Sequence, residues 1–321
     1  MRWRPIAVSA LRALIGLLVL WAVVRLLGLE RGYPLVALIA FTPYAAALAV
    51  VFLAVALYFR RWAEAGAAAA AVVLLAVAVL PRAFPDQPTG PIAGGLPLDV
   101  LTVNVNLGDA DAETIVELVR NRSVDLLSVQ ELTGDERTRL REAGIDEALP
   151  EQRLAPSRTG SSGAGIYSRY PLRALESVPG GISEMLRARV EAPGTAPVEV
   201  VTVHPFPPTG GSAPSWLRGL EALPPADAGG PIRILPGDFN SGFDHDAFRE
   251  LVATGYVDAA AALGQGLAPT WPSDRGRPPP VTIDHVLADE RVHVADVEVI
   301  EVPETDHRAV YARLLLPPER G

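Results

Sequence analysis

The sequence predicts an α/β domain, a sandwich in which helices cover packed sheets, preceded by three membrane-spanning helices. Two observations support this fold class. Residues 1–82 contain few polar side chains, whereas the chain from about Pro85 onward has an ordinary globular composition. The later part alternates short β-branched runs with amphipathic stretches, which is the pattern of a mixed α/β fold.

Three apolar runs make up the first part of the chain: Ile6–Leu29, Tyr33–Phe59 and Ala63–Leu80. Each is near or above the roughly 20 residues needed to cross a bilayer core. A cleaved signal peptide is the competing interpretation of the first run. Its apolar core is too long for that, and two further runs follow without a convincing small-residue cleavage site. Residues 1–82 are therefore predicted to be a membrane anchor.

Charge predicts how the anchor is oriented, because Lys and Arg mark the cytoplasmic loops. The N-terminus and the second loop are rich in arginine, while the first loop offers only Glu30 beside Arg31. Three spans that start inside finish outside, so we expect a multi-pass protein of the cell membrane whose chain after Leu80 is extracytoplasmic. The arginines that set this orientation are Arg2, Arg4, Arg12, Arg60 and Arg61.

The chain changes in composition and charge after the last span. Residues 83–97 are rich in Pro and Gly, which predicts a linker that spaces the domain from the lipid surface. Beyond residue 82 the chain carries 20 arginines, no lysine and 35 acidic residues, a net charge of −15. This balance lacks the basic footprint of a protein that tracks long nucleic acid.

The predicted domain covers residues 98–316, and residues 317–321 form a tail. Its β-branched runs predict strands and its amphipathic stretches predict helices, the first of which Asp109 or Asp111 can cap. The predicted strands cover 98–106, 124–132, 163–172, 186–192, 198–206, 231–240, 281–289, 292–302 and 308–316, and the predicted helices 111–121, 135–144, 215–223 and 245–255.

Acidic, amide and imidazole residues lie at the ends of these predicted strands. Taken singly, each has a simple structural explanation, because Asn and Asp often end strands and the Gly-Asp-Phe-Asn stretch at 237–240 is common in turns. Their joint order is what predicts a site assembled from several loops. In chain order they are Asn104, Asn106, Gln130, Glu131, His204, Asp238, Asn240, Asp284, His285, Asp306 and His307.

The motifs that contain these residues resemble the endonuclease/exonuclease/phosphatase superfamily over about residues 98–316. They are LTVNVN, VQEL, GIYSRYPL, VTVHPF, PGDFN, TWPS, TIDHVL and TDHRAV, in the order of that family. The resemblance implies a four-layer α/β/β/α sandwich (DNase I-like) with a divalent-metal site at one end. It also implies a hydrolase of phosphoric esters, since members include deoxyribonucleases, abasic-site endonucleases, neutral sphingomyelinases and inositol polyphosphate phosphatases.

The resemblance implies a metal site around Glu131, which would bind Mg2+ or Mn2+ because hard cations choose oxygen ligands. Asn104 and Asn106 would complete or flank the metal shell through side-chain oxygens. Asp306 would be a further ligand, direct or bridged by water, and Gln130 would lie behind the metal ligands. Asn106 stands where many members have aspartate, which reduces the negative charge around the metal.

The resemblance also implies the catalytic roles. Asp238 would orient or deprotonate the attacking water, and Asn240 would donate to the phosphate or hold the nucleophile in line. His307 would contact the scissile phosphate as imidazolium or act as a base, while Asp284 fixes its tautomer. His204 would bind phosphate or protonate the leaving group.

Two more residues are candidates for substrate binding. Trp271 either borders the pocket or packs under its loop, and Arg169 either pairs with acids near the site or lies on the surface. His285 is predicted to be structural, because it follows Asp284 on a strand and therefore faces the opposite way. For the stretch that contains His245, Asp244 or Asp246 as a helix cap is explanation enough.

These observations predict a membrane-anchored, metal-dependent phosphoester hydrolase that acts outside the cytoplasmic membrane. A phospholipid or small phosphoester is favoured slightly over nucleic acid, because the anchor holds the site near lipid and the domain is acidic. A tethered extracellular nuclease is the alternative within the same chemistry. Outside it, the alternatives are a catalytically silent binding module and a structural membrane protein with a carbohydrate- or protein-binding outer domain. The sequence leaves the choice of monoester or diester and the oligomeric state open.

Overall fold

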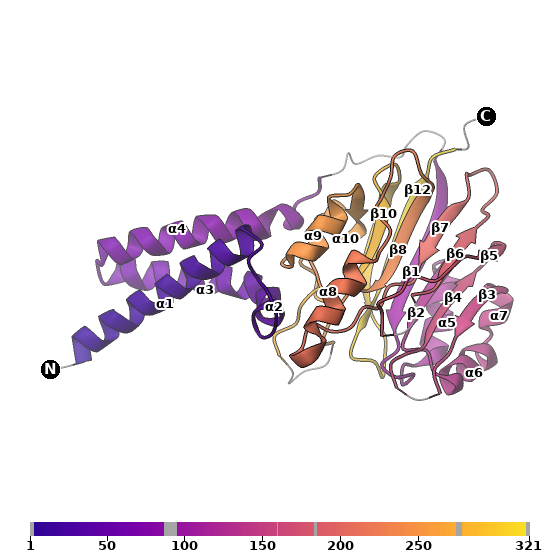
Figure 1. Ribbon diagram of the computed structural model, residues 1–321, viewed down its shortest axis with the longest axis horizontal. Coiled ribbons are helices and arrows are strands. Elements are labelled where there is room, and N and C mark those ends of the chain that lie inside the picture. Colours follow the sequence, from indigo (N-terminus) through magenta and orange to yellow (C-terminus); the bar gives the residue numbers. More distant parts are fainter. Residues whose placement is uncertain (1–2, 87–94, 159, 183–184, 274–277, 319–321) are drawn as a thin grey trace.

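The computed structural model describes residues 3–86, 95–158, 160–182, 185–273 and 278–318. A bundle of apolar helices forms one end of the molecule, and an α/β sandwich forms the other (Figure 1). The chain enters the sandwich with the strand that begins at Leu96 and leaves it with the strand that ends at Leu316.

The helical bundle confirms the three predicted apolar spans. Segments Ile6–Leu26, Leu35–Tyr58 and Trp62–Ala83 are long and apolar enough to cross a membrane. The first helix has 24 residues and is therefore about 36 Å long, against about 30 Å for a bilayer core. The helices of the bundle are α1 (Trp3–Leu26), α2 (Leu35–Leu38), η1 (Ile39–Phe41), α3 (Thr42–Tyr58), α4 (Trp62–Val79) and η2 (Leu80–Ala83).

The bundle places the sandwich at the end opposite to the start of α1. The start of α1 and the α3–α4 turn, with Arg60 and Arg61, lie far from the sandwich, while η2 leads into it (Figure 1). Glu64, in the first turn of α4, accepts hydrogen bonds from Arg12 (2.9 Å) and Arg61 (2.8 Å), so this acidic group near the far end is paired. Three apolar segments that could each cross a membrane therefore separate the sandwich from the N-terminal end of the bundle.

The sandwich contains two six-stranded mixed sheets. The first has the order β11-β12-β1-β2-β4-β3 and the second the order β5-β6-β7-β8-β10-β9. The strands are β1 (Leu96–Asn104), β2 (Leu126–Gln130), β3 (Glu151–Ala155), β4 (Ala164–Ser168), β5 (Leu172–Ala174), β6 (Arg187–Val190), β7 (Val198–Val201), β8 (Ile232–Asp238), β9 (Tyr256–Asp258), β10 (Asp284–Asp289), β11 (His293–Glu301) and β12 (Arg308–Leu316).

The predicted strands all appear, with three differences. The run 163–172 is divided between β4 and β5, which belong to different sheets, and Pro171 lies at the break. Strand β3 was not predicted, because it is an edge strand whose partly exposed side chains lack a hydrophobic pattern. The short β9 was also missed; it has only three residues.

The four predicted helices are present, and three short ones were missed. The first begins where predicted, because the Asp111 side chain accepts a hydrogen bond from Thr114 N at 2.7 Å and so caps it. The helices of the sandwich are α5 (Ala112–Asn121), α6 (Gly134–Glu142), α7 (Ile145–Ala148), η3 (Gly210–Ser212), α8 (Ala213–Glu221), α9 (Asp246–Val252) and α10 (Ala259–Ala262).

Three hydrophobic cores correspond to the three contacts between four layers. On β1, Leu98 and Val100 face the second sheet, while Leu101 and Val103 face α5, as the period of two in a strand requires. A third core lies between the second sheet and helices α8 and α9. The result is the expected α/β/β/α sandwich, with helices on both outer faces (Figure 1).

The anchor packs directly on the second sheet's helical layer. Val36 of α2 belongs to the same core as α8 and α9, and its carbonyl oxygen lies 3.0 Å from His245 Nε2. Buried Asp244 pairs with both Arg82 (2.7 Å) and Arg25 (3.5 Å). We call Arg25, Arg82 and Asp244 the junction cluster. It joins the ends of two membrane segments to the loop before α9.

The predicted linker over residues 83–97 is structured at both ends. Asp86 N donates to Ala262 O at 3.2 Å, and Leu96 already belongs to β1. Residues 87–94 lie outside the described residues. The described segment that follows the last apolar helix is therefore bound to α10, so it does not act as a free spacer.

Candidate active site

Strand ends from both sheets meet at one edge of the sandwich. Parallel β1 and β2 end together at Asn104 and Gln130, which are partners in register. In the second sheet, β8 and β10 are antiparallel and Asp238 pairs with Asp284. The end of β8 therefore lies beside the start of β10. His307 lies immediately before β12, which pairs with β1. The two sheets thus bring residues more than 200 positions apart to one edge.

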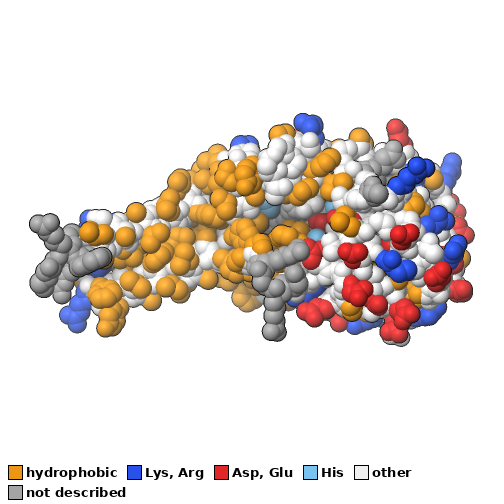
Figure 2. All heavy atoms as spheres, turned by 90° about the horizontal axis from the view of Figure 1, so that it is seen from below, with side chains coloured by type: hydrophobic (Ala, Val, Ile, Leu, Met, Phe, Trp, Pro, Cys, Tyr) orange, Lys and Arg blue, Asp and Glu red, His pale blue; other side chains and the backbone are white. Residues whose placement is uncertain are grey.

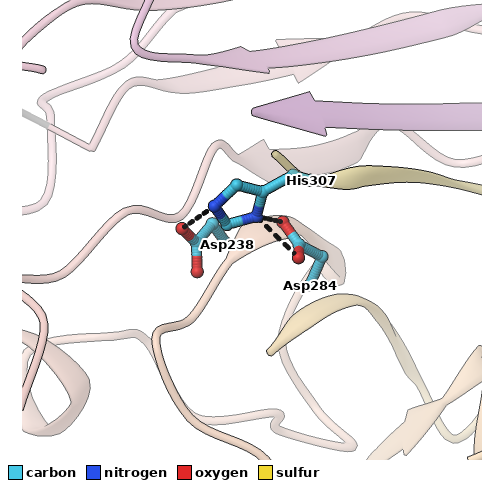
Figure 3. A group of neighbouring side chains, drawn as sticks. All are labelled: Asp238, Asp284 and His307. Atoms are coloured by element: carbon cyan, nitrogen blue, oxygen red, sulfur yellow. Dashed lines mark hydrogen bonds and ion pairs between the residues drawn. The ribbon is translucent and has the colours of Figure 1, made fainter. Parts of the chain in front are cut away.

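Asp238, Asp284 and His307 form the centre of this edge (Figure 3). One ligand atom from each lies within 4.8 Å of the others, and all three residues are buried. His307 Nδ1 lies 2.9 Å and 3.1 Å from the two carboxylate oxygens of Asp284. Its Nε2 lies 3.9 Å from Asp238 Oδ2. The imidazole therefore stands between two carboxylates, bonded to one and facing the other.

Local backbone contacts fix this arrangement. Gly237 lies against the Val203 backbone, where a Cβ would come within 2.2 Å of the carbonyl oxygen, so only glycine fits. The Thr270 hydroxyl accepts from the backbone N–H of Asp284 at 3.0 Å. The Thr305 hydroxyl accepts from His307 N at 3.2 Å and donates to Asn104 O at 2.8 Å. These threonines hold the strand ends in place.

A second group lies beside the first and is joined to it by Asn104. The Asn104 amide nitrogen donates to Asp238 Oδ2 (3.1 Å) and to Glu131 Oε1 (3.3 Å). His204 Nε2 lies 3.7 Å from the same two oxygen atoms. Glu131 is also held through its other oxygen, which accepts from Leu107 N at 2.8 Å. The carboxylates of Glu131 and Asp238, which come from different sheets, thus both lie next to Asn104 and His204.

Asn104 and Asn106 differ from the predicted ligand role. The Asn104 side-chain oxygen, which that role requires, accepts from Asn106 N at 3.0 Å. The amide therefore presents its nitrogen to the carboxylates and acts as a hydrogen-bond donor. Asn106 enters the network through its backbone.

The remaining predicted residues line the outer part of the site. Asn240 N donates to Asp238 Oδ1 at 2.8 Å, and its side chain donates to Pro205 O at 3.0 Å. Trp271 donates from its indole nitrogen to Asp306 Oδ2 at 3.0 Å. The other Asp306 oxygen lies 4.0 Å from His307 Nε2. Trp271 and Asp306 therefore border the central imidazole, and both are partly exposed.

Several of these residues adopt an unfavourable backbone conformation. Asn106 (φ 46°), Glu131 (φ 62°) and Asn240 (φ 48°) lie in the left-handed region that favours glycine. Such strain collects at functional sites, where the surrounding contacts enforce it. For Glu131 those contacts place the carboxylate beside Asn104 rather than along the strand direction.

The charges at the centre perturb one another. Burial, and then the negative charge of Asp284, raise the pKa of Asp238 to about 7. Burial acts to lower the pKa of His307, but the charge and hydrogen bond of Asp284, together with Asp238 and Asp306, outweigh it and raise that pKa to about 9. At neutral pH the imidazole is therefore protonated.

The second group behaves differently. Burial, with a smaller contribution from His307, lowers the pKa of His204 to about 3. His204 is therefore a neutral imidazole at physiological pH. Burial also raises the pKa of Glu131. Two histidines at one edge thus carry different charges, which suits them to different tasks.

Arg169 does not join the site. It follows β4, whose end pairs with the start of β2 (Leu126 with Ser168), whereas the site lies at the other end of β2. Arg169 Nε pairs with Asp125 Oδ1 at 3.0 Å. The prediction of a substrate-binding role is corrected on this ground, since the antiparallel direction of β4 carries the residue to the opposite edge of the sheet.

The sequence placed Gln130 behind the metal ligands but did not show its hydrogen-bond partners. Gln130 is fully buried, and its amide donates to Thr102, Ser128 and Thr202, so it joins the two sheets beneath the site. Such a network shows no pattern in the sequence beyond polar residues inside β-branched runs. His285 is structural, as predicted; it is held by Asp258 (2.8 Å) and by Ser241 O (3.0 Å).

The chain is similar to one family of known proteins. A model of the Endonuclease/Exonuclease/phosphatase family matches residues 101–307. No curated protein sequence matches the chain.

Solved structures share the fold at low identity. An endonuclease/exonuclease/phosphatase from Beutenbergia cavernae DSM 12333 is 20% identical, with a TM-score of 0.52 over 68% of this chain and 72% of the other. TDP2 of D. rerio, solved in complex with a single-strand DNA product, is 18% identical, with a TM-score of 0.52 over 68% of this chain and 98% of the TDP2 chain. A functionally unknown conserved protein from Enterococcus faecalis V583 is 15% identical, with a TM-score of 0.52 over 68% and 100%.

Proposed function

The chain belongs to the endonuclease/exonuclease/phosphatase family of phosphoester hydrolases, and we propose that it is a membrane-anchored hydrolase that uses a divalent metal to cleave phosphoesters. One observation carries this proposal. Asp238, Asp284 and His307 converge within 4.8 Å at the edge where Glu131 and Asn104 also lie. A silent binding module would not need buried carboxylates and a charged imidazole held in this way.

The donor set fits a hard cation such as Mg2+ or Mn2+. Burial raises the pKa of Glu131 and of the neighbouring Asp238, so a cation beside these carboxylates would stabilise their charged forms. Carboxylate oxygens are the ligands that these ions prefer. We assign Glu131 as the group that would hold the cation, with Asp306 beside it. When bound, the cation neutralises charge that develops on the phosphoryl oxygens.

The protein's own residues account for the proton transfers. Asp238, fixed by Asn240 N and Asn104, orients a water and takes its proton as the water oxygen bonds to phosphorus. The bond from phosphorus to the leaving oxygen breaks in the same displacement. His307, protonated and oriented by Asp284, donates from Nε2 to a phosphate oxygen. His204, as a neutral imidazole, donates a hydrogen bond to a phosphate oxygen, and the leaving oxygen takes its proton from solvent.

We infer that the site acts outside the cytoplasmic membrane on a phospholipid or another small phosphoester. The inference rests on the arginines at the N-terminal end of the bundle and in the α3–α4 turn, which favour a cytoplasmic location there. The net charge of −15 beyond residue 82 argues against a long nucleic acid substrate. A tethered nuclease is the second candidate, and the TDP2 structure with a DNA product shares the same fold.

The test uses the full-length protein, since Val36 of the anchor is part of a core of the sandwich. Turnover of bis(p-nitrophenyl) phosphate, phospholipids, inositol phosphates and DNA is measured with Mg2+, Mn2+ or EDTA. We expect metal-dependent turnover that Asp238→Ala and His307→Ala each reduce by at least about a hundredfold. Arg169→Ala is the matched control and should retain activity. Absence of turnover on every substrate by a folded, metal-binding protein would support the silent binding module instead.

A further inference from the structure

A groove of about 550 Å³ lies between α1 and the segment formed by α2, η1 and α3. Its walls are apolar along their whole length, with Leu14, Leu17 and Trp21 on one side and Leu48 and Phe52 on the other. Leu17 (59% exposed) and Leu48 (44% exposed) remain accessible at its rim. The groove lies on helices that could cross a membrane, where its open side would face lipid.

The depth of the groove corresponds to one leaflet. On α1 it extends from Leu14 to Val24, which is about 15 Å at 1.5 Å per residue, or half of a bilayer core of about 30 Å. This half is the one nearer the sandwich, because α1 runs toward it (Figure 1). The groove therefore has the length and the position of an acyl chain in the leaflet that faces the catalytic domain.

A series of residue contacts joins the domain-side end of the groove to the active site. Tyr44, on the groove wall, donates its hydroxyl to Pro280 O at 2.7 Å. The next residue, Val281, pairs with Trp271 in a β-bridge. Trp271 in turn bonds Asp306 beside His307. Figure 2 shows the apolar surface of the helices extending to the part of the sandwich where acidic and histidine side chains reach the surface.

We propose that this groove binds an acyl chain of the substrate lipid, so that the lipid's phosphoester lies at the Trp271 side of the active site. The proposal rests on the proposed hydrolase function and names its substrate class as a lipid phosphoester. The groove supplies chain recognition, while the sandwich supplies the chemistry. It explains why the anchor is docked on the sandwich by buried groups: a mobile tether would not keep the groove and the site in line.

The experiment compares two substrates that share one leaving group. Full-length protein in lipid nanodiscs is assayed with methyl p-nitrophenyl phosphate and hexadecyl p-nitrophenyl phosphate. Leu48→Trp fills the groove from its exposed rim. Val51→Trp is the matched control, because Val51 lies on the same helix and is 53% exposed but does not line the groove.

We expect Leu48→Trp to lower kcat/KM for the long-chain ester by about tenfold, the loss of roughly two methylene contacts, and to leave the methyl ester unchanged. Val51→Trp should match the wild type on both. Equal long-chain turnover by the two variants would overturn the proposal. Lack of turnover of both esters by the wild type would instead count against the hydrolase itself.

A binding readout tests the groove independently of activity. A phospholipid with a photoreactive acyl chain is cross-linked to the protein in nanodiscs, and the labelled peptides are identified by mass spectrometry. Labelling should concentrate on Leu17 and Leu48 over Val73 and Val77, which are exposed on α4 outside the groove, and Leu48→Trp should reduce it more than Val51→Trp does. Uniform labelling of all lipid-facing residues would overturn the proposal.

Discussion

At the scale of single residues, the site depends on one histidine being charged and the other neutral. His307 is bonded to Asp284, whereas His204 lies near carboxylates only at 3.7 Å and has no bonded acid among the described residues. Burial alone would make both neutral, so the Asp284 carboxylate determines which one is protonated.

Asp284→Asn should therefore change the pH dependence of turnover. With Asp284 present, the pKa of His307 is about 9, and activity is lost as pH rises through that value. Without the negative charge the pKa of His307 falls toward or below the ordinary value of 6.5. The high-pH side of the activity profile, where turnover falls, therefore moves to lower pH. At pH 8 the loss of imidazolium alone amounts to roughly thirtyfold.

The measurement is kcat/KM for bis(p-nitrophenyl) phosphate against pH. Asp258→Asn is the matched control, since it removes the same charge from the buried Asp258–His285 pair. Its falling limb should stay near that of the wild type. If the two variants have the same pH profile, the proposed role of Asp284 is wrong.

At the scale of elements, the close approach of β8 to the segment after β7 positions Asp238 and His204 together. Gly237 and Val203 form a β-bridge, and Val203 N donates to Pro236 O at 3.0 Å. His204 follows Val203 and Asp238 follows Gly237, so the spacing of these two backbones sets the distance between the two functional side chains. The glycine of the PGDFN stretch is required by this contact.

Gly237→Ala should lower both stability and activity. The new Cβ would lie 2.2 Å from Val203 O, so the backbones must separate, at a cost of about 1–3 kcal/mol. Thermal unfolding in detergent and metal-dependent turnover are measured together. Gly211→Ala serves as control, because nothing lies within 4 Å of a Cβ at that position. A Gly237 variant as stable and active as this control would contradict the steric account.

At the scale of the whole molecule, buried ionic and apolar contacts make the anchor and the sandwich one unit. In addition to the junction cluster, Glu30 accepts from Asp246 N at 2.6 Å, and Arg249 donates to Arg25 O at 3.2 Å. A buried pair is costly to break, because the remaining charge has no solvent to replace its partner. These contacts hold the candidate active site at a defined position relative to the helices that could cross a membrane.

Asp244→Ala should destabilise this junction by about 3–5 kcal/mol, since it leaves Arg25 and Arg82 buried without their carboxylate. We expect a lower thermal midpoint and faster hydrogen exchange in α9. Asp246→Ala removes a partly exposed pair with Arg249, worth about 0–1 kcal/mol, and is the control. Indistinguishable exchange in the two variants would show that the junction cluster does not hold the domain.

The sequence by itself determined the apolar spans, most strands and the four longer helices of the sandwich, and it predicted most residues of the candidate site. The length and the periodicity of apolar runs predict helices and strands from local sequence alone. Polar residues at the ends of predicted strands indicate where a site can form. The sequence also identified Glu131, Asp238 and His307 as members of one site. The sequence could not show that Arg169 lies at the edge of the sheet opposite to the site. The residues of a strand do not determine whether it pairs parallel or antiparallel with its neighbour.

Only the tertiary structure decided how the groups face one another. It turned the Asn104 amide toward two carboxylates, joined the sheets through Gln130, and fastened the predicted linker and Arg25 to the sandwich. Each of these depends on contacts between segments distant in sequence, whose geometry is set by packing in three dimensions rather than by local pattern. The same packing decided that the membrane anchor and the catalytic domain form one body.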